Sequence, residues 1–404
     1  MTDPGRSTPT TLLGRLANAV YPDIDEWQWN RQQNAKMKAG LRADLAEGPL
    51  PLRRLPADRP SHVVVIPMDG PEHDTWRLAG GNFFWEIAQA AREYAGADKV
   101  SVFCVEPNES TTSWHRRLAA FLDETGATHL IAQVEKDPAQ RGEWTWDVVW
   151  SELIESWDGI FLGVMFDSAY RWLTIPTRRL AKMSDRFLLV DICMPMDGVL
   201  IQGRSEVGPV NMPVSTQTLE IADAAVEGKP KIHDVTFIGA LYPYRVELID
   251  KLRAAGLRVA VNPHRSDVTH DLDSSRENQP GYVDYLGALA QSHMTINFSQ
   301  SSAGPFQQLK TRVLEASAMG CLVLTDDVDR TELFWVEGEE YDFFRSTDDL
   351  PAVVGRWLSA PDELRKAQEA AKHRARSINA SSFWGGIQDG LLRRGLRPVL
   401  PVES

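Results

Sequence analysis

The feature that most constrains this fold is a repeated alternation between short apolar runs and amphipathic, helix-like segments. A first series of such pairs extends from residue 62 to residue 195, and a second extends from residue 233 to residue 327. Short β-branched runs that end in Gly, Pro or Asp are typical of buried parallel strands that run into loops. Strands that alternate with helices predict doubly wound parallel sheets. The sequence therefore predicts an α/β protein with two parallel sheets.

The domain plan follows from the place where this alternation is interrupted. Residues 203–231 are rich in Gly, Pro, Ser and Thr, and we interpret them as the crossing between two domains. We predict two tandem Rossmann-like domains, residues 61–220 and residues 221–378, with a ligand site in the cleft between them. Residues 1–60 are predicted to be an N-terminal extension that holds a polar helix and a proline-broken linker.

The C-terminal tail, residues 379–404, has its own helical pattern. Phe383, Trp384, Ile387 and Leu391 recur there at the spacing of one helix face. We expect this tail helix to dock on one of the two domains.

Composition narrows the class of protein. Of the 404 residues, 43% are hydrophobic and 25% are charged, which is typical of a soluble globular protein with a large core. The net charge of −13 argues against a chain-wide nucleic-acid surface. The 13 tryptophans are interpreted either as packing residues or as an aromatic wall for a sugar.

Location is predicted from several weaker signals. The three cysteines lie far apart without a CxxC pair, which favours free thiols in a reducing compartment over zinc ligands. No apolar run is long enough to span a bilayer, and the first residues lack a signal-peptide pattern. We therefore expect a cytoplasmic protein without integral membrane association.

Polar residues follow the strands of the second series, where ligands bind in open α/β sheets. Tyr242 and Arg245 come after the first of these strands, Asn262 follows the second, and Asn297 lies late in the third. Asp326 and Asp327 follow the fourth, and their adjacent carboxylates are interpreted as a turn at the strand end. Because these ends meet at one edge of the sheet, they predict a ligand site there.

The segment from Ser299 to Glu315 combines a Ser/Gly-rich loop with a helix that carries Lys310 and Arg312. The free N–H groups of a helix N-terminus attract anions, phosphate above all, and both cations and Arg245 could add charge. Glu315, further along the helix, could accept hydrogen bonds from a ribose. A diphosphate beside a ribose indicates a nucleotide-sugar. The alternative is an exposed Arg312–Glu315 pair, which would contribute about 0.3 kcal/mol.

Several motifs in the second half resemble a known family. VTFIGALYPYRVELIDKLRAAGLRV, YVDYLGALAQSHMTINFSQSS, QLKTRVLEASAMGCLVLTDD and the segment that follows them resemble the glycosyltransferase domain of the spore-maturation (CgeB-type) family. The resemblance covers roughly residues 232–376. That family is related to family 4 glycosyltransferases of the two-domain GT-B fold.

The resemblance implies that the C-terminal domain binds a nucleotide-diphosphate sugar as co-substrate, without a further cofactor. Glu315 matches the acid that holds the ribose, while Arg245 and Lys310 match positions near the diphosphate. Family 4 enzymes carry a Glu-x7-Glu motif whose first acid contacts the sugar, and Gln307 stands there in this chain. This fold also implies that the tail helix packs back on the N-terminal domain.

The chemistry of glycosyl transfer predicts further roles. The helix N-terminus, Arg245 and Lys310 would stabilise the leaving diphosphate without a metal ion, and no clear DxD pair follows a strand of the N-terminal domain. A general base would come from the loop after the first strand, which carries Asp69, His73 and Asp74. The alternative is that these are ordinary polar loop residues. Asp167 and Asp191 are weaker candidates.

The sequence thus predicts a glycosyltransferase acting on a small-molecule or glycan acceptor, with no nucleic-acid partner. Two other functions fit the same fold. One is a nucleotide-sugar epimerase or hydrolase. The other is a non-catalytic binding protein, which the glutamine at position 307 favours.

Overall fold

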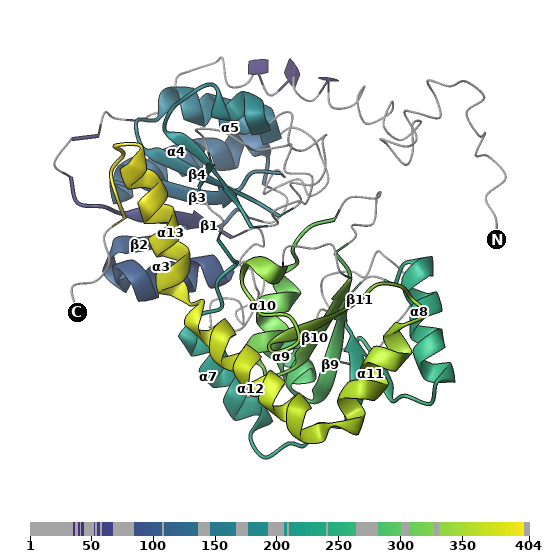
Figure 1. Ribbon diagram of the computed structural model, residues 1–404. Coiled ribbons are helices and arrows are strands. Elements are labelled where there is room, and N and C mark those ends of the chain that lie inside the picture. Colours follow the sequence, from purple (N-terminus) through teal and green to yellow (C-terminus); the bar gives the residue numbers. More distant parts are fainter. Residues whose placement is uncertain are drawn as a thin grey trace, which may run out of the picture.

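The computed structural model shows two parallel β-sheets, each flanked by helices (Figure 1). It describes residues 35–36, 39–40, 42–43, 52, 55–56, 59–67, 85–106, 109–135, 146–166, 177–192, 206–207, 210–239, 241–263, 282–299, 307–326 and 331–399. The prediction of an α/β protein with two tandem domains is confirmed. Most of the predicted N-terminal extension lies outside the described residues, although residues 35–36, 39–40 and 42–43 are helical and exposed.

The N-terminal sheet has six parallel strands in the order β2-β1-β3-β4-β5-β6. The strands are β1 (Val63–Ile66), β2 (Val100–Val102), β3 (His129–Gln133), β4 (Ile160–Met165), β5 (Phe187–Asp191) and β6 (Glu206–Val207). The helices that join them include α3 (Glu86–Ala95), α4 (Thr111–Thr125) and α5 (Trp146–Ser156). Strands β1, β3, β4 and β5 are buried along their whole length, as their continuous apolar runs predict.

Two apolar layers cover the faces of this sheet. Trp114 of α4 and Trp150 of α5 pack on one face, and neither side chain is exposed. Helix α3 packs on the other face together with the tail helix α13 (Ala380–Arg393) (Figure 1). The Trp384 ring of α13 stacks near the Tyr94 ring of α3. These tryptophans are packing residues, so they do not form an aromatic wall for a sugar.

The C-terminal sheet has five parallel strands in the order β11-β10-β9-β7-β8. The strands are β7 (His233–Phe237), β8 (Val259–Val261), β9 (Ser292–Asn297), β10 (Leu322–Asp326) and β11 (Tyr341–Phe344). The helices are α7 (Thr216–Val226), α8 (Pro243–Ala254), α9 (Tyr282–Ala290), α10 (Thr311–Ala318), α11 (Leu350–Ser359) and α12 (Pro361–Ser377).

Both sheets change their direction of winding at one point. In each domain the first strand lies between the second and the third, so β1 sits between β2 and β3, and β7 between β8 and β9. Helices on either side of such a point leave a crevice at the carboxyl ends of the first and third strands, where ligands bind in doubly wound folds. A ligand site is therefore expected at the switch points β1/β3 and β7/β9.

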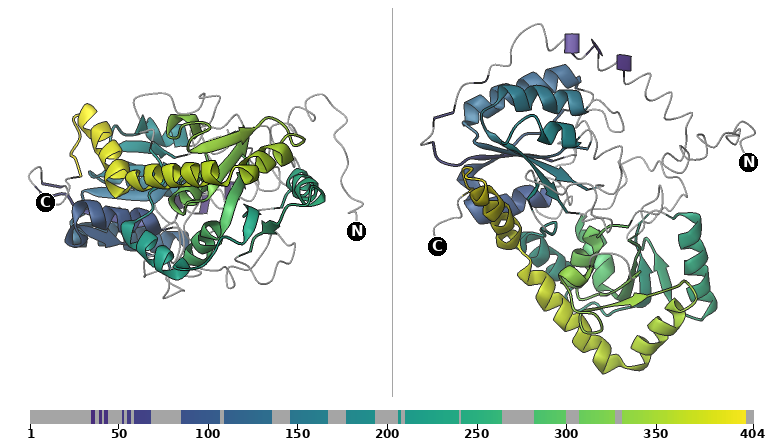
Figure 2. Two further views of the ribbon diagram at one scale, coloured as in Figure 1. Left: turned by 60° about the horizontal axis from the view of Figure 1, so that its bottom comes forward. Right: turned by 45° about the horizontal axis from the view of Figure 1, so that its top comes forward.

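The chain crosses between the two cores twice. Met212 belongs to the N-terminal core and Val214 to the C-terminal core, while Ile378 packs on the C-terminal core and Ala380 belongs to the N-terminal one. Helix α12 runs along the C-terminal domain and leads into α13 on the N-terminal domain (Figure 2). The two cores thus separate near residues 213 and 379, and the domain boundaries at 220 and 378 stay predictions.

Candidate functional site

The exit of strand β7 is shaped by Gly239 and Asn262. Gly239 has a φ of 144°, and Asn262 has a φ of 45°, which asparagine tolerates better than most residues. The Asn262 side chain accepts from Gly239 N–H at 2.8 Å and donates to Gly239 O at 3.2 Å. The end of β8 therefore holds the loop after β7 in a fixed position.

Arg245, in the first turn of α8, is enclosed by aromatic rings. Its guanidinium carbon lies 4.7 Å from the ring centroid of Tyr242, 5.3 Å from Tyr244 and 5.2 Å from Phe298. Its Nε donates to the Tyr244 hydroxyl at 2.8 Å. Burial lowers the pKa of Arg245, yet an arginine stays charged in proteins. The rings fix this cation by cation–π contacts at the switch point.

Arg312, in the first turn of α10, brings a second cation to the same place. The Phe237 ring lies 5.7 Å from the guanidinium carbons of both Arg245 and Arg312. The positive charge of Arg312 adds to the burial that lowers the pKa of Arg245, so the two cations repel each other. A Cβ atom at Gly239 would lie 3.0 Å from Arg312 Nη2. Glycine therefore leaves this guanidinium room beside the backbone.

The Arg312 side chain is only partly satisfied. Its Nη1 lies 3.5 Å from Asn297 Oδ1, which is long for a hydrogen bond. Its Nε is buried and has no hydrogen-bond partner among the residues that the structure describes. Such an N–H costs about 1–3 kcal/mol, more in a charged group. A ligand with acceptor oxygens would relieve this cost.

The neighbouring strand ends are held by side-chain hydrogen bonds. Asn297 Nδ2 donates to Thr325 Oγ1 at 3.0 Å, and Asp326 Oδ1 accepts from Ser299 N–H at 2.9 Å. The carboxylate of Asp326 thus fixes the chain after β9. The interpretation of Asp326 and Asp327 as a turn stays a prediction, because Asp327 lies outside the described residues.

Glu315 is buried rather than exposed in α10. Its Oε1 accepts from the Tyr282 hydroxyl at 2.8 Å, and its Oε2 accepts from the Tyr285 hydroxyl at 2.5 Å. Burial raises the pKa of Glu315, and the hydrogen bonds from the tyrosines oppose that shift. The interpretation as an exposed pair with Arg312 is wrong, because the side chain is only 5% exposed.

The start of α10 reaches toward the other domain. Lys310 occupies the N-cap position without a side-chain cap hydrogen bond, and it is half-buried like Gln307. Gln308 is buried, and its Nε2 donates to Phe166 O at 3.3 Å, just past the end of β4. The segment that carries Gln307 and Lys310 thus lies beside the end of β4 in the N-terminal sheet.

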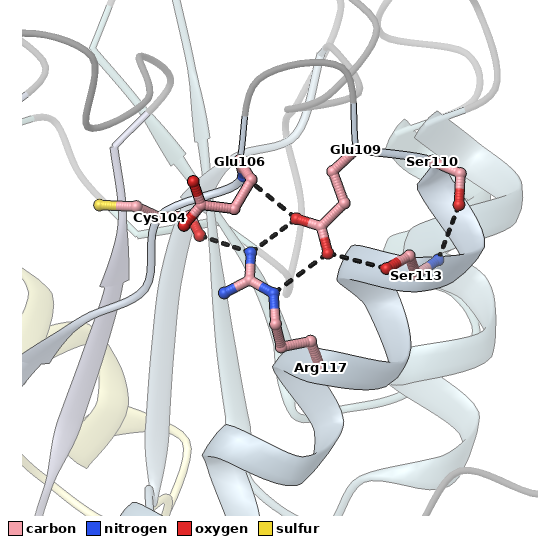
Figure 3. A network of polar contacts seen from close by, with 6 residues as sticks. All are labelled: Cys104, Glu106, Glu109, Ser110, Ser113 and Arg117. Carbon is pink, nitrogen blue, oxygen red and sulfur yellow. Dashed lines mark hydrogen bonds and ion pairs between the residues drawn. The ribbon is translucent and has the colours of Figure 1, made fainter.

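A different network lies at the end of β2 in the N-terminal domain (Figure 3). Arg117 Nη2 donates to Glu109 Oε2 at 2.6 Å and to Cys104 O at 2.8 Å. Glu109 also accepts from Ser113 Oγ at 2.9 Å and from Glu106 N–H at 3.1 Å. This arginine is neutralised by a carboxylate and serves to fix the loop that precedes α4.

The predicted catalytic residues are mostly outside the described part of the chain. Asp69, His73, Asp74 and Asp167 all fall there. Asp191 is described as the last residue of β5 and is buried.

Sequence reasoning missed one buried acid at the switch point of the N-terminal sheet. Glu135 lies two residues after β3 and is 2% exposed. Its Oε2 accepts from Gln133 Nε2 and from Phe166 N–H, both at 2.9 Å. The signal was available, since the predicted strand 129–135 ends in an acid at the edge where ligands bind.

The described residues form neither a candidate metal cluster nor a membrane-spanning helix. Among the described residues, no group of three His, Cys, Asp or Glu side chains could hold a metal ion. Within those same ranges, every helix is too short or too polar to cross a bilayer.

Comparison with known proteins supports the assignment of the C-terminal domain. Residues 245–381 match the family described as "Glycosyl transferase-like". This match includes Arg245, Arg312 and Glu315. No curated protein sequence matches the chain.

Solved structures share the fold across most of the chain. Sucrose-phosphate synthase from Thermosynechococcus elongatus superposes with a TM-score of 0.53 at 11% identity, covering 83% of this chain and 98% of that one. HepE from Anabaena, in complex with UDP-glucose, superposes with a TM-score of 0.55 at 10% identity, covering 82% and 99%. Residues 245–381 thus match a glycosyltransferase-like family, and the chain shares its two-domain α/β fold with these structures.

Proposed function

We propose that this protein transfers a sugar from a nucleotide-diphosphate sugar to a small-molecule or glycan acceptor, without a metal ion. The observation that carries the proposal is the pair Arg245 and Arg312 at the switch point of a glycosyltransferase domain. Both guanidinium groups face one phenyl ring, and one of them keeps a buried N–H without a described partner.

The two arginines suit a leaving diphosphate. Negative charge grows on the diphosphate as the glycosidic bond breaks, and cations fixed in advance stabilise that charge without reorganising. A guanidinium is planar and binds phosphate oxygens in pairs. Arg245 is held by its aromatic neighbours, so it would supply charge, while Arg312 would donate the unsatisfied N–H. Lys310 and the N-terminus of α10 would add to the same field.

Glu315 remains our candidate for the nucleotide ribose. An ionised carboxylate offers about four lone-pair sites, and the two tyrosine hydroxyls use two of them. The tyrosines would orient the carboxylate toward the ribose hydroxyls. Support for the donor class comes from HepE, whose solved complexes hold UDP-glucose and UDP with glucose. Gln307, Asn297 and Tyr242 complete the proposed donor side.

The acceptor would bind on the N-terminal domain. Asp69, His73 and Asp74 remain the proposed source of a general base, since they follow in sequence the strand β1, whose carboxyl end lies at the switch point of that domain. The closer assignment to the CgeB-type family is also part of this proposal, because it rests on the motifs of residues 232–376.

A thermal-shift experiment tests the donor half of the proposal. Wild type, Arg312→Ala and Arg365→Ala are melted with UDP-glucose, UDP and other nucleotide sugars; Arg365 is a mostly exposed control on α12. A ligand at 100 times its Kd should stabilise the fold by about 2.7 kcal/mol. We expect one nucleotide class to raise the Tm of wild type and of the control variant but not of Arg312→Ala. A flat response of wild type to every nucleotide would overturn the proposal.

Product analysis then separates transfer from the alternatives. A transferase releases nucleotide in proportion to acceptor glycosylated. An epimerase would convert the donor without an acceptor and without releasing nucleotide. A non-catalytic protein would bind the donor and leave it intact.

A further inference from the structure

A line of contacts joins the two switch points across the domains. It starts at Glu135 after β3, continues through the backbone of Phe166 after β4, and ends at Gln308 before α10. Glu135 lies opposite Phe166 because the β3–β4 register pairs Gln133 with Val164. The two outer steps are hydrogen bonds between described atoms, and the backbone of Phe166 links them covalently.

The burial of Glu135 calls for an explanation. A carboxylate that leaves water loses several kcal/mol of hydration, and hydrogen bonds recover that loss only in part. Glu135 is 2% exposed, yet one of its oxygens accepts two hydrogen bonds, one of them from the Phe166 N–H. A charged acceptor fixes a backbone N–H more firmly than a neutral one does. The carboxylate therefore sets the orientation of the Phe166 backbone.

The Phe166 carbonyl receives the other domain. Gln308 Nε2 donates to it at 3.3 Å, near the long limit for such a bond. The Gln308 side chain is 1% exposed, and its backbone N–H donates to Ser299 O at 3.1 Å. Gln308 is the neighbour of Gln307 and lies two residues before Lys310. Its position therefore sets the positions of these two proposed donor residues.

We infer that Glu135 is a positioning residue for sugar transfer: through the Phe166 backbone it docks the Gln308 segment of the donor domain against the acceptor sheet. Glu135 would affect the rate of transfer by aligning donor and acceptor, because a shift of about 1 Å in the positions of the reacting groups can lower the rate about 100-fold. This inference rests on the proposed function for its kinetic consequence. The docking itself does not depend on it.

Kinetic variants test the role. Glu135→Ala and Gln308→Ala should each lower kcat at least about tenfold and leave the Kd for nucleotide within about threefold of wild type. Since both act through one contact line, the double variant should be no slower than the slower single variant. Glu135→Gln keeps an acceptor oxygen for the Phe166 N–H and should retain most of the activity. If Glu135→Gln is as inactive as Glu135→Ala, the carboxylate acts in the chemistry itself and the inference is wrong.

Hydrogen exchange tests the docking without any activity. Glu135→Ala should speed amide exchange in residues 307–313, which lie in the other domain, and the matched control Glu109→Ala should not. Glu109 is a carboxylate of the same sheet edge that binds Arg117 instead. Unchanged exchange in Glu135→Ala would overturn the inference. A wild type that neither binds nucleotide nor transfers sugar would overturn the proposed function, and the exchange result would still decide the docking.

Discussion

The carboxyl ends of the two sheets hold arginines in opposite situations. At the end of β2, Arg117 binds Glu109 through two nitrogens and also a backbone carbonyl, so its charge is neutralised within the fold. At the β7/β9 switch point, Arg245 and Arg312 share one phenyl ring and repel each other. The arginines at the two sheet edges thus differ in their surroundings, since Arg117 is bound by a carboxylate whereas Arg245 and Arg312 approach the same aromatic ring.

The largest effect should come from removing the cation of the switch point. Arg312→Ala should lower kcat/KM for transfer by roughly 100- to 1000-fold, or about 2.7–4 kcal/mol, as the loss of a preorganised donor does elsewhere. Arg117→Ala should change it by less than about threefold. Steady-state kinetics would measure kcat/KM for both variants. Equal losses in the two would break the comparison between the sheet edges.

A second contrast concerns carboxylates of the N-terminal domain, one with an arginine partner and one without. Glu109 binds Arg117, whereas the partners of Glu86 among the described residues are Ser215 N–H at 2.6 Å and the Ser215 and Thr218 hydroxyls at the start of α7. Burial raises the pKa of Glu86 from 4.5 to about 7. The folded state therefore holds a proton that the unfolded state loses above pH 4.5.

This raised pKa gives stability that falls with rising pH. The contribution is fully present below pH 4.5 and is lost as pH rises to about 7, by roughly 3 kcal/mol in all. Glu86→Gln keeps a neutral side chain at every pH. As pH rises through this range, the free energy of unfolding of wild type should therefore fall relative to that of the variant. Urea unfolding at a series of pH values makes the comparison. Parallel curves for the two proteins would contradict a raised pKa.

A side chain at Gly239 should have a smaller effect on stability, because Gly239 leaves room for the Arg312 guanidinium. Gly239→Val introduces a Cβ atom about 3.0 Å from Arg312 Nη2 at a φ of 144°, which L side chains rarely adopt. The strain should lower the free energy of unfolding by about 2 kcal/mol and displace the guanidinium. Chemical denaturation and nucleotide titration would measure the two effects. A variant of full stability and affinity would mean that Arg312 does not depend on this approach.

The smallest effect should come from Glu109→Ala. This variant removes the partner of Arg117 and one acceptor for the backbone before α4, and it should lower the free energy of unfolding by about 1 kcal/mol. Nucleotide affinity should stay at the wild-type value. A large loss of affinity would show that this edge also serves the donor.

Local patterns in the sequence were enough for the fold class, since most buried strands are continuous apolar runs. They did not reveal β6 and α7, which lie in the segment interpreted as a domain crossing, or β11, which follows the predicted second series. The tail helix was also predictable, because Phe383, Trp384, Ile387 and Leu391 lie on one face and all are buried.

The sequence predicted the types of residue at the candidate site but not their partners. Arg245, Arg312 and Glu315 stood out as two cations and an acid near strand ends, but their partners come from distant segments. Glu315 binds tyrosines 30 and 33 residues away. Gln308 and Phe166 are 142 residues apart. Pairings of this kind depend on how sheets and helices pack, so no local pattern reveals them.

The most direct test of the account is calorimetric titration of UDP-glucose into wild type, Arg312→Ala and Arg117→Ala. The account predicts that wild type and Arg117→Ala bind with Kd values within about threefold of each other. It also predicts that folded Arg312→Ala binds at least about tenfold more weakly, since a charge-assisted contact contributes about 1.5–3 kcal/mol. Equal affinity of Arg312→Ala and wild type would contradict the claim that the β7/β9 switch point holds the diphosphate.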